Sequence, residues 1–220
     1  APISLFLREA PSRSEFYGAS NNQKKEGKEG PSNIAIVGWI SFAVLFCCTA
    51  MSVVVVHLVP LLTDQGLTAK SAANVLLILM IAGAFGRVLG GKLADTFGAI
   101  KSYALMSLTQ TSVIFLFPFI DNLYLTYLVA IIFGVGFSGT MATFLVCVRV
   151  MVTPSVLAKS MSIVGMSGWI GMAFGGLQGG VLFDLTGTYY WSFAVGSIAG
   201  VINLIVIFSF NTYLQRYKQG

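Results

Sequence analysis

Arg87 is the main candidate for binding an anion, because it is a single charged residue within a long apolar stretch of the sequence. A planar guanidinium donates two parallel hydrogen bonds to one carboxylate. An arginine inside a membrane-spanning helix is costly, and it usually faces a bundle interior or an aqueous cavity. A long side chain near a helix end can also reach the headgroups. Arg87 is therefore a candidate for binding or gating an anion, with interfacial anchoring as the competing interpretation.

Two segments of the sequence match each other without a gap. Residues 84–98 read AFGRVLGGKLADTFG and residues 173–187 read AFGGLQGGVLFDLTG, with eight identical positions. The offset of 89 residues spans three apolar segments, which would place the two copies on opposite sides of a membrane. Such inverted repeats are typical of secondary transporters. The identical pairs include Gly86/Gly175, Gly91/Gly180, Asp95/Asp184 and Gly98/Gly187.

The charged residues of the repeat suggest a gating role. We expect Asp95 and Asp184 just beyond the ends of their helices, where a carboxylate could interact with the N-terminus of a neighbouring helix. Lys92 and Asp95 would then form a gating or bracing pair, and the alternative is a pair of solvated loop charges. The glycines allow helix backbones to approach closely, either in static packing or along a surface on which helices slide.

His57 is the only histidine of the chain. Histidine titrates near neutral pH, so His57 is a candidate for proton coupling, although an interfacial or packing role is favoured. The sequence shows no metal-ligand cluster, no cofactor motif and no paired carboxylates within the apolar segments. It therefore predicts no metal, no cofactor and no enzyme, and an intramembrane enzyme is a poorly supported alternative.

The composition is that of a membrane protein. Of 220 residues, 56% are hydrophobic and only 10% are charged, and the mean hydropathy is +0.83. A soluble domain carries about 25% charged residues, so a soluble globular domain is excluded. The net charge of +5 does not indicate nucleic acid, because the basic residues are spread over tails and short loops.

Six apolar windows are long enough to cross a bilayer as helices, which takes about 20 residues each. Residues 1–33 are predicted to be a linker or cytoplasmic loop and residues 211–220 a cytoplasmic tail. The fold class is therefore an all-α membrane protein, with two inverted three-helix repeats. The predicted helices cover about 34–62, 72–91, 101–119, 123–149, 160–183 and 189–210.

Lysine and arginine counts predict the orientation of the helices. If residues 1–33 are cytoplasmic, that side holds eleven Lys and Arg residues and the opposite side holds only Lys70. Cytoplasmic loops carry such an excess. Both termini are therefore expected on the cytoplasmic side of a plasma membrane or bacterial inner membrane.

The sequence resembles the major facilitator superfamily at three places. The string Gly86-Arg87-x3-Gly91-x-Leu93-Ala94-Asp95-x2-Gly98 is similar to the motif after the eighth helix of that superfamily. Residues 57–68 and 183–189 are similar to segments of the monocarboxylate transporters and their bacterial oxalate–formate antiporter-like relatives. The resemblance implies the C-terminal six-helix half of a twelve-helix transporter. It also implies that Arg87 contacts the substrate carboxylate.

These observations together predict a secondary active transporter, or half of one, that moves a small organic anion such as a monocarboxylate by symport or antiport. The expected partners are the anion, the lipid bilayer, an N-terminal six-helix half and a coupling proton, but no nucleic acid. The alternatives are transport of another solute, such as a drug or a sugar, and a membrane subunit that does not transport.

Overall fold

The computed structural model describes residues 31–219, and these residues form helices joined by short turns. All but the last three residues of the linker expected over 1–33 lie outside the described part. Six helices are long and apolar enough to cross a membrane, as the sequence predicts. They are α2 (Asn33–Asp64), α3 (Ala69–Phe97), α4 (Ala99–Ile114), α5 (Leu123–Met151), α6 (Leu157–Thr186) and α7 (Tyr190–Gln219).

Several helices extend beyond the predicted windows. Helix α3 starts after Thr68, whose side chain accepts a hydrogen bond from the backbone of Ser71, and it ends at Gly98 with a φ of 88°. The Thr68 cap and the turn at Gly98, rather than the first charged residue, therefore set the ends of α3. Helix α7 continues through Gln219, so residues 211–219 continue the helix, and the cytoplasmic location of residues 211–220 stays a prediction.

Helix α4 is shorter than its predicted window, 101–119. The α-helix ends at Ile114, and residues Phe117–Phe119 form a 3-10 turn that contains Pro118. Proline lacks the backbone N–H that an α-helix needs, which explains why the helix stops before it. A second 3-10 turn, Pro154–Val156, precedes α6.

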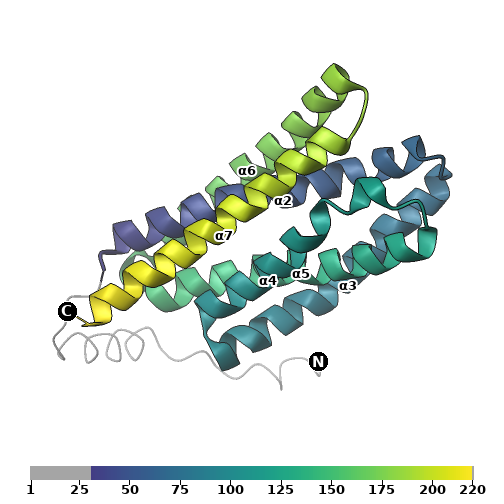
Figure 1. Cartoon of the computed structure of the whole chain (residues 1–220). Helices are drawn as coiled ribbons and strands as arrows, with labels where there is room; N and C mark the ends of the chain where they lie inside the picture. The colour runs from purple at the N-terminus through teal and green to yellow at the C-terminus, as the bar shows by residue number, and fades with distance from the viewer. Residues whose placement is uncertain (1–30, 220) are drawn as a thin grey trace, which may run out of the picture.

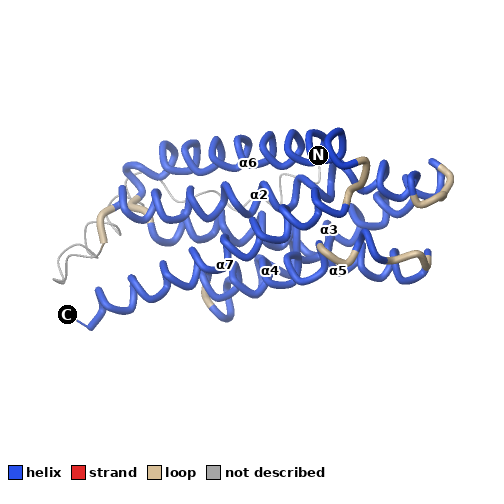
Figure 2. The backbone as a smooth tube through the Cα atoms, turned by 45° about the horizontal axis from the view of Figure 1, so that its top comes forward, coloured by secondary structure: helices blue, strands red, loops and turns tan. Residues whose placement is uncertain are grey.

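The six helices form one bundle (Figures 1 and 2), and the contacts between them have an internal two-fold relationship. The first repeat is α2–α3–α4 and the second is α5–α6–α7. The most extensive contacts join α3 to α5 and α6 to α2, and the next join α4 to α5 and α7 to α2. Exchanging the repeats converts each of these contacts into its counterpart, which is the relationship expected of inverted repeats.

The closest backbone approaches obey the same two-fold relationship. Gly171 of α6 packs against the carbonyl of Leu45 in α2, and Gly134 of α5 packs against Ala82 in α3. The offset of 89 residues relates Leu45 to Gly134 and Ala82 to Gly171. The predicted inverted repeat is therefore confirmed by the packing.

At each end of the bundle, a hydrogen bond joins two segments that are distant in the sequence. At one end, Asn33 at the start of α2 donates to the hydroxyl of Thr153, with 2.8 Å between the atoms. At the other end, Gln65 donates to the carbonyl oxygen of Pro118 at 3.2 Å. The ends of alternate helices therefore gather together, as a chain that crosses a bilayer repeatedly requires.

Candidate functional site

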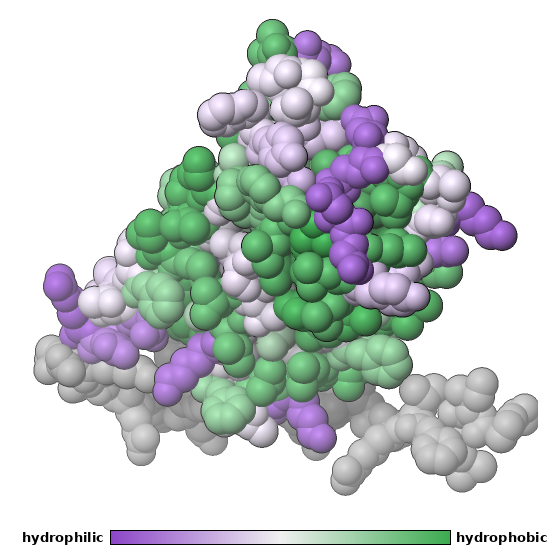
Figure 3. Space-filling view, turned by 45° about the vertical axis from the view of Figure 1, so that its right-hand side comes forward, coloured by the Kyte–Doolittle hydropathy of each residue, from purple (hydrophilic) through white to green (hydrophobic). Residues whose placement is uncertain are grey.

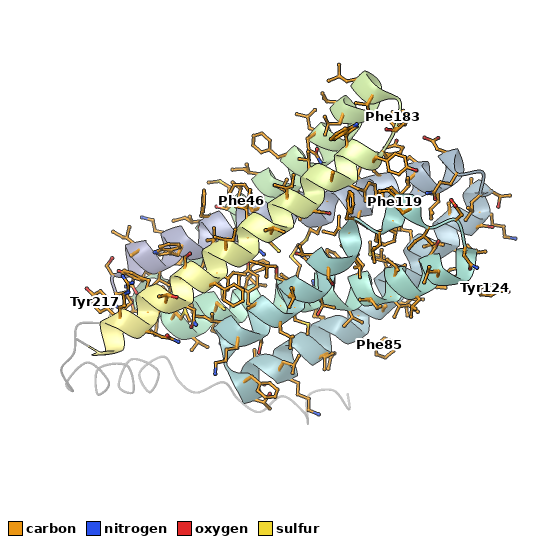
Figure 4. All side chains as sticks on the ribbon, in the orientation of Figure 1. Phe46, Phe85, Phe119, Tyr124, Phe183 and Tyr217 are labelled. Atoms are coloured by element: carbon orange, nitrogen blue, oxygen red, sulfur yellow. The ribbon has the colours of Figure 1, made fainter. Side chains whose placement is uncertain are left out.

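Arg87 lies on an outward face of α3. Its side chain is exposed, as are those of Leu77, Ile81 and Val88 of the same helix. Phe85 of α3 also points away from the bundle (Figure 4). Only 33% of the most apolar stretch of α3 is buried, against 56% for α5. Among the described helices, none covers the face that carries Arg87.

Helix α3 continues well beyond Arg87. Arg87 lies ten residues before the end of α3 at Phe97, which corresponds to about 15 Å of helical rise. The sequence window predicted an end at residue 91, within about one turn of Arg87. The exposed charges of Lys92 and Asp95 lie between Arg87 and the helix end, so both the anion-binding and the interfacial interpretation of Arg87 remain open.

Lys92 and Asp95 lie within α3 rather than in a loop, and both side chains are exposed. The expectation that Asp95 and Asp184 follow their helices is wrong, because α3 continues to Phe97 and α6 to Thr186. Each aspartate therefore occupies the last turn of its helix. A carboxylate there interacts unfavourably with the negative end of the helix dipole, so neither aspartate is placed to stabilise its own helix.

The glycines of the repeat have two different environments. A Cβ atom on Gly86 would lie 2.6 Å from the Cα of Val135 in α5, and one on Gly90 would lie 2.7 Å from the carbonyl oxygen of Gly139. Gly175 makes an equally close approach, with 2.8 Å to the Cβ of Ser52 in α2. These glycines let α3 reach α5 and α6 reach α2. They are the close approaches that small residues allow in membranes.

The remaining repeat glycines face open space or end helices. A Cβ atom on Gly91 or on its counterpart Gly180 would meet nothing within 4 Å. Gly98 and Gly187 have φ angles of 88° and 70°, a region that favours glycine over other residues. The last glycine of each copy therefore reverses the chain, while Gly91 and Gly180 leave room for a neighbour outside the described bundle.

His57 joins α2 to α6 at the end of the bundle opposite Lys92. Its Nε2 lies 2.9 Å from the carbonyl oxygen of Gly176, and its ring packs on Tyr189 with 5.5 Å between centroids. Gly179 provides the space for the imidazole, because a Cβ there would collide with the ring. Gly176 is the repeat counterpart of Arg87. The second copy therefore has no charged side chain at this position, and its backbone carbonyl binds His57.

Aromatic and acidic residues surround this end of α6. Phe183 stacks on Tyr189 with 4.3 Å between ring centroids, and Phe183 marks the far end of α6 in Figure 4. Burial raises the pKa of the Tyr189 phenol above its usual value, and the carboxylates of Asp64 and Asp184 raise it further. Asp184 therefore lies close enough to influence the loop that follows α6.

A buried polar network between α4 and α7 was not singled out from the sequence. The Tyr103 hydroxyl donates to Oδ1 of Asn203 at 3.0 Å, and Nδ2 of Asn203 donates to the Ser107 hydroxyl at 2.5 Å. Gln110 donates to the sulfur of Cys47 at 3.2 Å. The available signal was one amide side chain in the apolar window of α4, Gln110, and one in that of α7, Asn203. Their partners, between 63 and 100 residues away, could not be identified from that signal.

Hydrophobic residues cover much of the face drawn in Figure 3, and many large hydrophobic side chains of the described residues are exposed. Six membrane-spanning helices in two inverted repeats define a multi-pass membrane transporter fold. The family model of the Major Facilitator Superfamily matches residues 38–219, and the chain belongs to that superfamily. Its members are transporters rather than enzymes. The predicted superfamily is therefore confirmed. A comparison with curated proteins found no match.

Proposed function

We propose that this chain is the C-terminal six-helix half of a secondary active transporter that moves a small organic anion, a monocarboxylate, by alternating access. The observation that carries the proposal is the exposed guanidinium of Arg87 on an outward face of α3, about 15 Å of helical rise from the helix end. A carboxylate accepts two hydrogen bonds from such a group. Arg87 would bind the anion near the membrane midplane, between this bundle and a second one.

The second bundle would pack on α3 and α6. These helices lie at opposite edges of the bundle (Figure 1) and are its least covered elements, with 33% and 22% of their most apolar stretches buried. The open positions at Gly91 and Gly180 would let another helix backbone approach closely. We assign this place to the N-terminal six-helix half of the same transporter.

Lys92 and Asp95 would gate the end of the pathway that faces the cytoplasm. Asp95 opposes the dipole of α3, so it would gain from the N-terminus of a helix in the other half. Asp184 would make the symmetry-related contact at the outer end. Both termini of the chain would be cytoplasmic in this arrangement, in a plasma membrane or bacterial inner membrane, because the lysine and arginine excess lies at that end.

The chief role of His57 would be to hold α2 against α6 at the outer end, since a backbone carbonyl of α6 already binds its Nε2. Carrying a coupling proton is its second candidate role, because imidazole titrates near neutral pH. The two roles differ in their effect on the pH dependence of uptake.

Uptake of labelled carboxylates, sugars and cationic drugs by the intact protein in proteoliposomes tests the proposal. Arg87→Gln should abolish carboxylate uptake while membrane insertion persists. Arg149→Gln is the matched control, because Arg149 is an exposed arginine in the last turn of α5. Transport of only a sugar or a drug would assign another substrate. The absence of any transport by the intact protein would favour a non-transporting subunit.

A further inference from the structure

A cleft of about 700 Å³ lies between the first turns of α2 and α6, away from α3 and Arg87. Its lining residues extend from Ser32 to Ser41 along α2 and from Val156 to Ile163 along α6. Nine residues of α2 correspond to about 14 Å of helical rise. The cleft therefore begins at the end of the bundle, where the headgroups lie, and continues alongside the hydrocarbon.

The walls of this cleft are aliphatic. Ile34, Val37, Val156 and Ile163 line it, and Gly38 leaves one wall open, because a Cβ there would meet nothing within 4 Å. An extended, non-helical polypeptide segment in such a place would bring backbone N–H and C=O groups that aliphatic walls cannot satisfy. A hydrocarbon chain carries no such groups, so the walls fit an acyl chain better than a peptide.

The mouth of the cleft is positive. Among the described residues that line it, Lys159 alone is charged. The N-termini of α2 and α6 lie beside it. The Ser32 side chain caps α2 by accepting a hydrogen bond from the backbone of Ala35, whereas no side chain caps α6. Helix N-termini carry a partial positive charge. A cation and two such termini around one opening complement an anionic headgroup.

Ser41 offers a polar contact within the cleft. Its hydroxyl is buried and has no hydrogen-bond partner among the described residues. By contrast, Ser160 and Ser162 of α6 donate to the carbonyl four residues earlier, at 2.9 and 3.0 Å. The Ser41 hydroxyl oxygen exposes almost no surface, so it would reach an ester or glycerol oxygen of an occupant after rotation of its side chain.

We propose that this cleft binds one anionic phospholipid from the leaflet at that end. Its phosphate lies at Lys159 and the start of α6, and its acyl chain lies along Ile34, Val37 and Ile163. Basic pockets between transmembrane helices are a recurring form of anionic-lipid site.

Native mass spectrometry of the intact protein tests this proposal. The protein would be released from bilayers of equal parts phosphatidylglycerol and phosphatidylcholine. The wild type should retain phosphatidylglycerol preferentially. Lys159→Gln should lower that preference about fivefold, which corresponds to about 1 kcal/mol for one basic residue near an anionic surface. Gly38→Leu should fill the cleft and remove the retained lipid of both kinds.

Two variants serve as matched controls. Lys101→Gln removes an exposed lysine at the same end, and Gly165→Leu adds a side chain to α6 where a Cβ meets nothing within 4 Å. Neither residue lines the cleft, so both should retain lipid like the wild type. Retention unchanged by Gly38→Leu would overturn the proposal. A wild type that retains no lipid would also overturn it. Unfolding of Gly38→Leu in lipid-free detergent would overturn it as well, because it would indicate that the protein itself fills the cleft.

Discussion

Thr111 of α4 and Gly200 of α7 occupy equivalent positions in the two repeats and contact each other directly. The offset of 89 residues relates them, and a Cβ atom on Gly200 would lie 2.6 Å from both Oγ1 and Cγ2 of Thr111. Two equivalent residues can contact each other only where the two-fold axis passes between them. Thr111 and Gly200 therefore mark the axis on the α4–α7 side of the bundle.

The contact across the axis predicts the effect of exchanging its two residues. Gly200→Thr alone should lower the free energy of unfolding by about 1–3 kcal/mol, because it overpacks the contact. Adding Thr111→Gly restores the original pair in mirror order and should recover about 1 kcal/mol through coupling between neighbours. Denaturant-induced unfolding in detergent of the wild type, the two single variants and the double variant measures the coupling. Strictly additive effects would show that the two positions do not share an axis.

Glycines of the repeat should respond differently to the same substitution. Gly86→Ala should destabilise the bundle by about 1–3 kcal/mol, because its Cβ collides with the backbone of α5. Gly91→Ala is the matched control and should leave the free energy of unfolding unchanged or raised, since a helical glycine costs about 1 kcal/mol relative to alanine. Thermal unfolding in detergent separates the two variants. Equal destabilisation by both would contradict the packing described for α3.

His57 should matter for stability more than for the pH dependence of uptake. His57→Ala removes a donor to the Gly176 carbonyl and empties the space beside Gly179, and it should cost about 2–4 kcal/mol as a cavity-forming change. His57→Gln retains a donor and should transport with an unchanged pH profile. A flattened profile in His57→Gln would instead identify His57 as the carrier of a coupling proton.

The polar network between α4 and α7 should contribute modestly to stability. Asn203→Leu leaves the hydroxyls of Tyr103 and Ser107 without their partner, and hydrogen bonds within membranes are worth about 0.6–1.7 kcal/mol. We expect a loss of about 1–2 kcal/mol in the free energy of unfolding. Thr109→Leu is a control outside the network, because the Thr109 hydroxyl bonds only within its own helix. Equal losses in both variants would indicate that the network adds nothing specific.

The existence of the six helices and their two-fold relationship could be predicted because both are encoded locally. Apolar windows predict helices that cross the bilayer, and the repeated glycines predict where two helix backbones approach closely. The helix ends were less predictable. Lys92 and Asp95 suggested that α3 ends at the membrane surface, whereas a helix continues into water until a residue such as Gly98 stops it.

The candidate site could be predicted only in part, because its environment depends on distant residues. The type and isolation of Arg87 identified it. The carbonyl that binds His57 lies 119 residues away, and a backbone acceptor leaves no signature in a sequence. Tyr103 and Asn203 are similarly separated, by 100 residues, so neither could be paired before the packing of α4 on α7 was known.

The central claim is that Arg87 recognises the charge of a carboxylate substrate. The most direct measurement compares uptake of a monocarboxylate with uptake of its neutral amide, for the wild type, Arg87→Gln and the Arg149→Gln control. The account predicts that the wild type and Arg149→Gln strongly prefer the carboxylate and that Arg87→Gln loses this preference. An Arg87→Gln variant that still discriminates the carboxylate from its amide as the wild type does would contradict it.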